Sequence, residues 1–471
     1  MDEFDVVVIG GGPVGENVAD RAVRGGLTAA LVESEKFGGE CSYWACMPSK
    51  ALLRPGQALR EAQHVRGALT GATALDPSEV FARRDAVVRN WDDEGQVRWA
   101  NTAGITTIRG HGRLAGPRRV TVTVTGPDGA ETALTARHAV VVATGTDAAV
   151  PDIPGLRAAA PWTSREATSA KAAPGRLAVI GGGVVAAEMA TAYAGLGSRV
   201  TLIARSGLLT NLEPFAGEAV GEGLRALGVD VVTGESPTRV SRAGGEVTIE
   251  TSGGRTVVAD EVLAATGRAP RTVDLGLESV GLEPGAWLAV DDTLRVEGYD
   301  WLYAAGDVNH RALLTHQGKY QARAAGDAIV ARARGAAVDD AAWGAHVATA
   351  DHAAVPQVIF TEPEVAAIGV TEAQARKSGT DVAVVDYDLG WVAGASLYAD
   401  GYSGRARMVV DEGRGVVIGM TLVGPAVAEL LHAATIAVVG EVPIDRLWHA
   451  VPAYPTISEV WLRLLEAYRD R

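Results

Sequence analysis

The chain has 471 residues, of which 47% are hydrophobic and 21% are charged, as is typical of a soluble globular protein. Its formal net charge of −14 argues against nucleic acid and anionic membranes as partners, because both repel an acidic protein. The chain starts MDEFDVVVIGGG, which lacks the basic segment and cleavage site of a secretory signal, and no apolar run approaches the roughly 18 residues of a membrane helix. We therefore expect a cytoplasmic protein.

The first predicted elements are a strand, a helix and a second strand. Residues 4–10 form an apolar, β-branched run that ends in glycine, and residues 16–24 have a helical pattern. Residues 28–33 predict a second strand, which ends at Glu33. This order is typical of a βαβ unit with parallel strands.

A glycine-rich turn follows the first strand, with the G-x-G-x-x-G spacing at Gly10, Gly12 and Gly15. In a dinucleotide site Gly10 permits the tight turn, Gly12 lets the backbone approach a pyrophosphate, and Gly15 lets helix and strand pack closely. The N-terminus of the helix donates amide hydrogens to the phosphates, and Glu33 can accept hydrogen bonds from an adenosine ribose. The alternative is a glycine turn in another α/β sheet, but the flanking strand, helix and acid favour a dinucleotide site.

The two cysteines of the chain, Cys41 and Cys46, follow in the stretch GGECSYWACMPSK. A disulfide that closes so short a loop stabilises a fold very little. They are either unrelated core residues or a redox pair, and the absence of any other cysteine from the sequence favours the pair. A helix beginning near Cys46 would favour the thiolate form of that residue. Tyr43 and Trp44, which lie between the cysteines, could line a substrate pocket or pack beside a cofactor.

Residues 50–100 have helical patterns, and a second strand–helix–strand unit follows later in the chain. Residues 176–180 predict its first strand, a helix runs through about residue 197, and residues 199–205 predict its second strand. The turn of this unit repeats the glycine spacing with Gly181, Gly183 and Ala186.

Arg205 ends the second unit, at the position where an NAD site would place an acid. A guanidinium can bind a 2′-phosphate, whereas a carboxylate would repel it. The alternative is an exposed surface arginine. We therefore expect this site to take NADPH rather than NADH.

A further repeat links residues 141–147 with residues 262–270, since both are apolar runs that lead into Ala-Thr-Gly, at Gly145 and at Gly267. The chain therefore carries two related nucleotide-binding halves. With a cysteine pair beside the first half, this arrangement predicts a relay in which hydride from a nicotinamide crosses a flavin and reduces a disulfide. After about residue 345, strands flanked by helices predict an α+β domain.

In these motifs the chain resembles the class I pyridine nucleotide–disulfide oxidoreductases, which include glutathione reductase, dihydrolipoamide dehydrogenase and mercuric reductase. The resemblance covers nearly the whole chain. It implies an α/β fold with two Rossmann-like nucleotide-binding domains and an α+β dimerisation domain. The expected domains are an FAD-binding domain over 1–148 and 268–345, an NAD(P)H-binding domain over 149–267, and a dimerisation domain over 346–471.

The same resemblance assigns FAD contacts. In YAAGD (303–307), Asp307 resembles the residue that meets the ribityl chain of the flavin. Thr144 and Gly145 resemble the flavin-contacting turn of the family, and Gly112 resembles its adenine contact. FTEPEVAAIG (360–369) is similar to the start of the dimerisation domain. FAD and NADPH are the cofactors that the resemblance implies, and a homodimer is the assembly.

The resemblance also assigns the thiol chemistry. Cys46 is the thiol that contacts the flavin, and Cys41 is the thiol that exchanges with the substrate. Lys50 and Glu188 form an ion pair near flavin N5. Without the resemblance, a lone lysine or glutamate would be read as a solvated surface charge.

One position departs from the family pattern. Members that reduce disulfides usually end with His-Pro-Thr-x-x-Glu, in which the histidine reaches across the dimer to the exchange thiol and the glutamate orients it. Here Tyr454 stands in the place of the histidine, while Glu459 is retained. A histidine ordinarily titrates near about 6.5 and shuttles protons at neutral pH, whereas a tyrosine, near about 10, is mostly a donor. Tyr454 could bind a thiolate, an oxyanion or a quinone oxygen of the partner subunit's site, or it could fill the dimer interface.

We therefore expect an enzyme that relays electrons through Cys41 and Cys46 to or from a small thiol or disulfide. The lost histidine predicts weak activity on glutathione disulfide and lipoamide. One alternative is a diaphorase that reduces quinones, metal ions or oxygen directly from flavin, and another is a non-enzymatic redox sensor. The sequence has no additional C-terminal cysteine pair, so we expect no metal relay of the mercuric reductase kind and no metal site.

Overall fold

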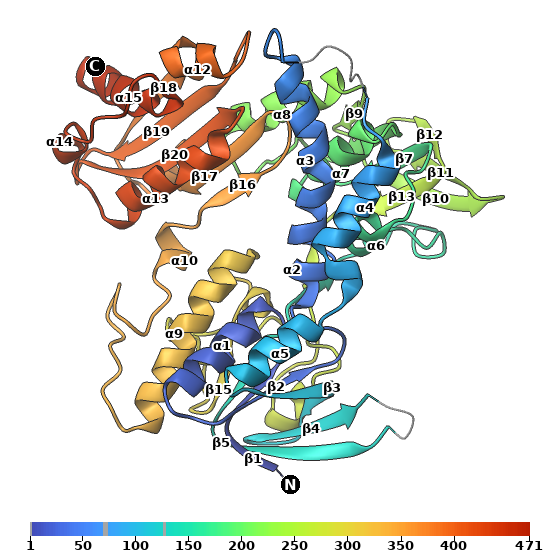
Figure 1. Cartoon of the computed structure of the whole chain (residues 1–471), viewed down its shortest axis with the longest axis vertical. Coiled ribbons are helices and arrows are strands. Elements are labelled where there is room, and N and C mark those ends of the chain that lie inside the picture. Colours follow the sequence, from blue (N-terminus) through green and yellow to red (C-terminus); the bar gives the residue numbers. More distant parts are fainter. Residues whose placement is uncertain (1, 69–73, 126–128) are drawn as a thin grey trace. The chain divides into compact units, whose positions relative to one another are not determined.

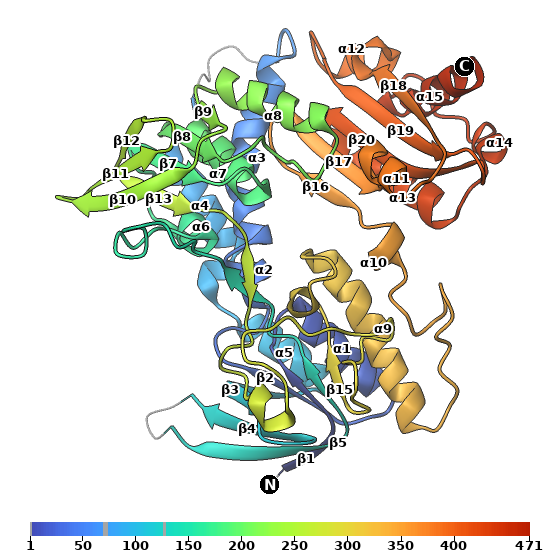
Figure 2. The same cartoon turned by 180° about the vertical axis from the view of Figure 1, so that it is seen from behind.

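The computed structural model describes residues 2–68, 74–125 and 129–471 (Figures 1 and 2). The chain passes back and forth between two compact units. The first unit holds the residues up to Met47, together with Val88–Asp147 and Arg268–His352. The second holds Pro48–Val87, Ala148–Gly267 and Ala353–Arg471. The domain boundaries expected from the sequence stay a prediction.

The first unit is built on a sheet whose central strands run parallel in the order β3–β2–β1–β5–β15. Strand β4 pairs antiparallel with both β3 and β5. Successive residues of β1 pack into different clusters, Val8 beside Val18 of α1 (Pro13–Arg24) and Val7 on the opposite face, so residues 6–9 of the strand are all apolar. The strands are β1 (Asp2–Ile9), β2 (Ala29–Glu33), β3 (Thr106–Leu114), β4 (Arg119–Val124), β5 (Glu131–Val142) and β15 (Leu302–Ala304).

Helix α1 (Pro13–Arg24) starts earlier than its apolar pattern predicts, because proline is favoured at the first helical position. It packs along α9 (Thr315–Ala333), where Arg21 donates two hydrogen bonds to Asp327, at 2.8 and 2.6 Å. The other helical elements of this unit include α2 (Gly39–Tyr43), η1 (Arg89–Trp91), α5 (Glu94–Thr102), η2 (Leu277–Val280) and η3 (Asp307–Asn309). A short pair of strands, β6 (Thr146–Ala148) and β14 (Arg268–Pro270), lies at the edge of the unit.

The second unit contains the repeated βαβ motif. Its parallel sheet has the order β13–β7–β8–β9, and the strand predicted over residues 176–180 is confirmed as β7. The elements of this motif are β7 (Arg176–Ile180), α7 (Val184–Gly195), β8 (Arg199–Ala204), α8 (Pro214–Ala226), β9 (Asp230–Thr233) and β13 (Glu261–Ala264). An antiparallel sheet joins it, formed by β10 (Pro237–Ala243), β11 (Glu246–Thr251) and β12 (Thr256–Ala259).

The C-terminal part of the second unit is an antiparallel sheet with the order β16–β17–β20–β19–β18. Its strands are β16 (Gln357–Ile359), β17 (Glu364–Gly369), β18 (Val382–Asp388), β19 (Arg405–Asp411) and β20 (Val416–Gly424). The helices around it are α11 (Glu372–Lys377), α12 (Ala393–Tyr398), α13 (Leu431–Val439), α14 (Ile444–Leu447) and α15 (Val460–Arg469). The α+β texture predicted after about residue 345 is therefore confirmed, and the fold as a whole is α/β as expected.

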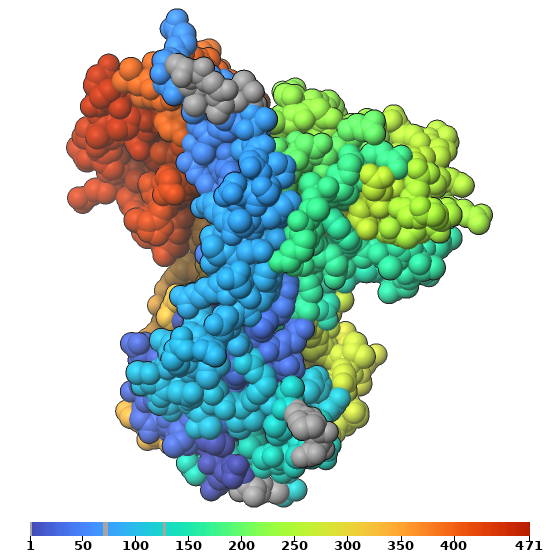
Figure 3. Space-filling model, turned by 45° about the vertical axis from the view of Figure 1, so that its right-hand side comes forward, coloured from blue at the N-terminus to red at the C-terminus, as the bar shows by residue number. Residues whose placement is uncertain are grey.

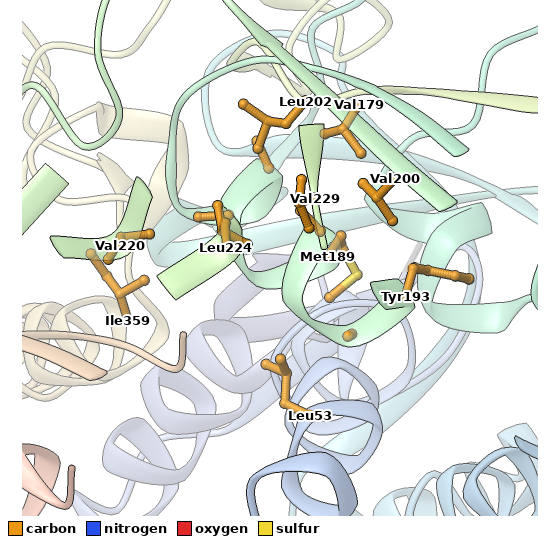
Figure 4. Packing of buried hydrophobic residues seen from close by; sticks show 14 of the residues in the cluster. Leu53, Val179, Met189, Tyr193, Val200, Leu202, Val220, Leu224, Val229 and Ile359 are labelled. Atoms are coloured by element: carbon orange, nitrogen blue, oxygen red, sulfur yellow. The ribbon is translucent and has the colours of Figure 1, made fainter. Parts of the chain in front are cut away.

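Two N-terminal helices, α3 (Cys46–Gln63) and α4 (Pro77–Val87), contribute to the core of the second unit. Leu53 of α3 and Ile359 of β16 join the buried cluster that contains Met189 and Tyr193 of α7 (Figure 4). On the surface of the unit, the light-blue chain of α4 lies beside the green chain around α6 (Ser164–Ser169) in Figure 3. Residues distant in sequence therefore share one core.

Arg84 anchors α4 in this core although its side chain is charged. The side chain is fully buried, pairs with Asp85 at 2.6 Å and donates to the backbone oxygens of Thr168 and Ala170. Its guanidinium also lies over the ring of Phe81. A buried charge with this many partners is a structural tie rather than a solvated group.

Candidate dinucleotide and dithiol sites

The first glycine loop has the geometry that the sequence predicts. Gly10 has a φ of 110°, and a Cβ there would lie 2.3 Å from the backbone oxygen of Ala143. A Cβ on Gly15 would lie 1.9 Å from the backbone oxygen of Gly10, so any side chain would separate α1 from the loop. At Gly12 a Cβ would meet only Gly39, at 3.8 Å. The loop therefore leaves the N-terminus of α1 accessible for phosphate groups.

Glu33 ends β2 beside this loop. Its carboxylate accepts hydrogen bonds from the backbone nitrogens of Gly11 and Glu35, each at 2.7 Å. Burial raises the pKa of Glu33, while these two backbone hydrogen bonds lower it. Because each carboxylate oxygen can accept more than one hydrogen bond, Glu33 retains capacity for ribose hydroxyls.

The residues expected to meet the flavin lie around the turn after β5. Asp307 follows β15 and accepts a hydrogen bond of 2.8 Å from the hydroxyl of Thr146. Burial raises the pKa of Asp307, and the hydrogen bond from Thr146 opposes that shift. Thr144 Oγ1 is buried and has no partner among the described residues, and nothing lies within 4 Å of a Cβ placed on Gly145. An orphaned hydroxyl next to open space fits a polar group such as a flavin.

Gly112 lies elsewhere in the same unit, in β3. A Cβ there would approach side chains of Ile9 and Val32, each at 3.2 Å. Ile9 is the last residue of β1, and Val32 is the last but one of β2. Gly112 is therefore near the carboxyl ends of both strands. That end of a parallel sheet is where nucleotides bind.

The two cysteines are adjacent in space. Cys41 lies in α2, and Cys46 is the first residue of α3, so the helix predicted to begin near Cys46 is confirmed. Both are free thiols. The neighbouring Cys46 side chain and burial raise the pKa of the Cys41 thiol. Cys46 Sγ also lies 3.3 Å from the hydroxyl of Thr315, the first residue of α9.

The aromatic residues between the cysteines have different environments. Tyr43 is buried, and its hydroxyl donates to the backbone oxygen of Asp92 at 3.3 Å. The indole nitrogen of Trp91 donates to the backbone oxygen of Tyr43 at 3.1 Å. These contacts hold Tyr43 in place, and the two roles expected for the aromatic residues stay a prediction.

The second glycine loop repeats the geometry of the first. Gly181 has a φ of 137°, and a Cβ there would lie 2.2 Å from the backbone oxygen of Ala265. Ala143 and Ala265 begin the two Ala-Thr-Gly runs, so each run packs against the first glycine of its own loop. This contact gives the sequence repeat a structural reason.

The rest of the second loop is as open as the first. Ala186 is fully buried in α7, whereas nothing lies within 4 Å of a Cβ placed on Gly183. Arg205 follows the last residue of β8 and is exposed. Gly267, with a φ of 154°, accepts a hydrogen bond from the backbone nitrogen of Ala149. The Arg205 guanidinium is therefore accessible to a phosphate.

Lys50 and Glu188 form the expected ion pair within the second unit. Lys50 Nζ donates to both oxygens of Glu188, at 3.0 and 2.7 Å, and the Glu188 side chain is only 4% exposed. The backbone nitrogen of Phe360 donates to the same carboxylate at 3.1 Å, and Lys50 Nζ lies 4.9 Å from the centre of the Phe360 ring. Glu188 thus has partners that fix its position.

Tyr454 and Glu459 lie before α15 in the second unit. Tyr454 is 75% exposed, and Val451 close to it in sequence is 85% exposed. Glu459 is buried, and its Oε2 has no partner among the described residues. The chain therefore presents the tyrosine outward while it retains the glutamate inside.

Sequence reasoning missed several residues of the first unit. Arg268 links Glu40 of α2 to Thr146, and Thr315 contacts Cys46. Glu16 of α1 is only 8% exposed, and its Oε1 has no partner among the described residues. Burial raises the pKa of Glu16 to about 7. No signal in one sequence separates such an acid from the ordinary acids of a first helical turn.

No helix in the parts that the structure describes is long and apolar enough to cross a membrane. Over the same residues, no group of three or more histidine, cysteine, aspartate or glutamate side chains could hold a metal ion.

Comparison with known proteins shows the family of the chain. Residues 4–328 match the family model for pyridine nucleotide-disulphide oxidoreductases, and residues 355–464 match the dimerisation domain of that family. A mercuric reductase of Acidithiobacillus ferrooxidans is 33% identical over 97% of this chain and 81% of its own length. A glutathione reductase of Burkholderia cepacia is 30% identical over 98% of both chains. A dihydrolipoyl dehydrogenase of Haloferax volcanii is 30% identical over 98% of this chain and 95% of its own.

Solved structures show the same fold. The HOCl-induced flavoprotein disulfide reductase RclA of Escherichia coli, in complex with Cu(II), has a TM-score of 0.83. It is 24% identical in sequence, and the match covers 99% of each chain. The two family matches and the extended identity to three kinds of relative lead to one conclusion: the chain is an enzyme that belongs to the pyridine nucleotide-disulphide oxidoreductase family.

Proposed function

We propose that the enzyme is an FAD-dependent, NADPH-using oxidoreductase that relays electrons through Cys41 and Cys46 to or from a small thiol or disulfide. The observation that carries this proposal is that Cys41 of α2 and Cys46, the first residue of α3, are neighbouring free thiols. Two neighbouring thiols can form and break one disulfide. By resemblance to the family, this disulfide would hold the electron pair between the flavin and the substrate.

FAD would bind to the first unit. The N-terminus of α1 would hold the diphosphate, Glu33 the ribose, and Asp307 the ribityl chain, with Gly112 at the adenine. Thr144 and Gly145 would contact the flavin ring. Bound FAD would supply a two-electron carrier between nicotinamide and thiol. The fit rests on the orphaned hydroxyl of Thr144 and the open space at Gly145.

NADPH would bind to the second unit. The N-terminus of α7 after Gly181 and Gly183 would hold the diphosphate, and the exposed Arg205 would bind the 2′-phosphate. The family resemblance places Lys50 and Glu188 beside flavin N5. Because the backbone nitrogen of Phe360 also fixes Glu188, the ion pair would hold the Lys50 charge in one position.

The enzyme would act as a homodimer through the C-terminal part of the second unit. The match to a dimerisation domain supports this, and so do large apolar side chains that a monomer leaves exposed. Trp391, Leu397 and Ile436 are 74%, 71% and 58% exposed, and Tyr454 is 75% exposed. A second copy of the chain would cover them, and Tyr454 and Glu459 would then approach the disulfide of the partner subunit.

An anaerobic titration with NADPH tests the proposal. Wild-type enzyme should take up two electron pairs, one for the flavin and one for the disulfide. It should also show a long-wavelength charge-transfer band, which depends on Cys46 beside the flavin. Cys46→Ser should lose the band and take up one pair. A wild-type protein without flavin, or one whose flavin NADPH does not reduce, would disprove the proposal.

Cys41→Ser separates the thiol relay from the diaphorase alternative. The variant should retain reduction of the flavin by NADPH and lose all turnover of disulfides. If the wild type turns over quinones and no disulfide, and Cys41→Ser leaves the quinone rate unchanged, then the enzyme is a diaphorase. The exposed Tyr454, which lacks the basicity of a histidine, is the observation that favours this alternative.

A further inference from the structure

A buried glutamine of α9 holds the turn that follows β15. Gln321 is fully buried, and its Oε1 accepts hydrogen bonds from the backbone nitrogen of Gly306, at 2.7 Å, and from Asn309 Nδ2, at 2.8 Å. Gly306 directly precedes Asp307, the residue expected at the ribityl chain, and Asn309 ends the same η3 turn. A Cβ on Gly318, in the same helix, would lie 3.2 Å from Gly306, so α9 is in direct contact with the turn. One side-chain oxygen therefore fixes the backbone on both sides of Asp307.

Backbone groups of fixed polarity set the direction of this amide. Asn309 Nδ2 also donates to the backbone oxygen of Ala304 at 3.1 Å, and Asn309 Oδ1 accepts from the backbone nitrogen of Arg311 at 3.0 Å. A backbone oxygen only accepts and a backbone N–H only donates, so Asn309 and Gly306 both present donors to Gln321. Gln321 must therefore turn its oxygen towards them, and its Nε2 then needs an acceptor elsewhere.

Asp351 supplies that acceptor. It lies in the short helix α10 (Ala350–Ala353), belongs to the first unit and is buried. Its Oδ2 accepts from Gln321 Nε2 at 2.8 Å, and its Oδ1 accepts from Gln317 Nε2 at 2.9 Å. Gln317 is one turn before Gln321 on α9, so the carboxylate receives two donors from one face of the helix. Burial raises the pKa of Asp351, whereas these two hydrogen bonds lower it.

We infer that Gln321 and Asp351 are positioning residues for the flavin: Asp351 fixes the direction of the Gln321 amide, and that amide holds the turn around Asp307 ready for FAD. The inference rests on the proposed binding of FAD to the first unit. A turn that is ordered before FAD binds loses less conformational entropy on binding, so the affinity for FAD is higher. Asp307 itself accepts a hydrogen bond from Thr146 and retains capacity for a ribityl hydroxyl.

Release of FAD from the full-length holoenzyme tests the inference. Release after dilution is followed by the rise in flavin fluorescence, in potassium bromide at one fixed concentration that accelerates dissociation. Gln321→Met, a nearly isosteric change, removes the acceptor of both donors in the turn and should release FAD at least about tenfold faster than the wild type. Asp351→Leu removes the acceptor of the Gln321 amide nitrogen and should accelerate release by about three- to tenfold.

The double variant shows whether Asp351 acts through Gln321. If it does, Asp351→Leu adds little in the Gln321→Met background, and the double variant should release FAD at the rate of Gln321→Met. This comparison remains decisive even if Asp351→Leu alone does not fold, because the double variant has no Gln321 amide to leave without a partner. Accelerations that multiply in the double variant, or a double variant that unfolds while Gln321→Met folds, would overturn the inference.

Asp327→Leu is the matched control, because Asp327 is also on α9 but pairs with Arg21. It should lower stability in urea and leave the release of FAD unchanged. If Asp327→Leu accelerated release as much as Asp351→Leu, general loss of stability would explain the result and the inference would be wrong.

Hydrogen exchange at the Gly306 amide gives a readout that needs no flavin. Peptide mass spectrometry should show faster exchange in Gln321→Met and Asp351→Leu than in the wild type, and normal exchange in Asp327→Leu. Unchanged exchange in Gln321→Met would contradict the inference. A wild-type protein without flavin would disprove the proposed function, while exchange at Gly306 would still report on Gln321 and Asp351.

Discussion

Arg268 and Glu40, 228 positions apart in the chain, form an ion pair of 2.6 Å between β14 and α2. Arg268 also donates to Thr146, at 2.8 Å to its hydroxyl, and that hydroxyl donates to Asp307 at 2.8 Å. A continuous set of polar contacts therefore runs from the helix that carries Cys41 to the residue expected at the flavin.

Arg268→Met should weaken both the fold and the flavin site. Both partners are mostly buried, with side chains 21% and 17% exposed, so the change leaves the Glu40 charge without its partner. We expect the free energy of unfolding to fall by about 2–4 kcal/mol and FAD to dissociate more readily. Urea unfolding and release of flavin fluorescence measure the two effects.

Arg271→Met is the matched control, because Arg271 pairs with the more exposed Asp147 at 2.6 Å. It should cost about 1 kcal/mol or less. Equal losses in the two variants would show that the pairing of Glu40 has no special role.

Glu16 should make the stability of the enzyme fall as pH rises. Its pKa is raised by burial from 4.5 to about 7, so between these values the folded state holds a proton that the unfolded state has lost. Stability is then lost from about pH 4.5 to about pH 7 and stays reduced above that range. Glu16→Gln should raise the free energy of unfolding at pH 8 by about 2–3 kcal/mol, and by much less at pH 5.

Unfolding at both pH values measures this effect, with Glu94→Gln as the exposed comparison. A gain from Glu16→Gln that is the same at pH 5 and pH 8 would contradict the assignment of the titration to Glu16.

Arg84 should be essential for stability, although it is distant in sequence from every residue expected to bind a cofactor or to react. Arg84→Met removes a fully buried guanidinium, together with its ion pair to Asp85 and its hydrogen bonds to two backbone oxygens, although Asp85 keeps Lys171 at 3.0 Å. The free energy of unfolding should fall by about 3 kcal/mol or more. Arg83→Met, at the exposed neighbouring position, should change it by about 0.5 kcal/mol. Thermal unfolding that shows similar losses for both variants would refute the structural role.

Arg205 should decide between the two nicotinamide cofactors. Arg205→Leu should lower kcat/KM for NADPH by at least about tenfold, as loss of a charge-assisted hydrogen bond predicts, and leave kcat/KM for NADH nearly unchanged. Steady-state rates with both cofactors measure the ratio. A variant that loses activity equally with NADPH and NADH would show that Arg205 does not contact the 2′-phosphate.

The parts of the fold that a single sequence predicts are those with local causes. The strand over residues 176–180 follows from an apolar run, and the turn at Gly10 follows from a φ that only glycine adopts freely. The helix that begins at Cys46 follows from the helical sequence pattern of the residues after it. In each case the responsible residues are neighbours in the chain.

The parts that a sequence does not predict depend on contacts between distant segments. Thr315 contacts Cys46, and Arg268 contacts Glu40, but neither residue type nor spacing marks these pairs. Glu16 resembles a favourable acid of a first helical turn until its burial is known. The charge state of a carboxyl group therefore follows from tertiary packing, which the local pattern does not contain.

Cys41 lies in α2 and Cys46 begins α3, so each thiol belongs to a helix of its own. If the two thiols form a disulfide as proposed, the hydroxyl of Thr315, 3.3 Å from Cys46 Sγ, would help to set the midpoint potential of the couple, because a hydroxyl can donate a hydrogen bond to the thiolate of the reduced form.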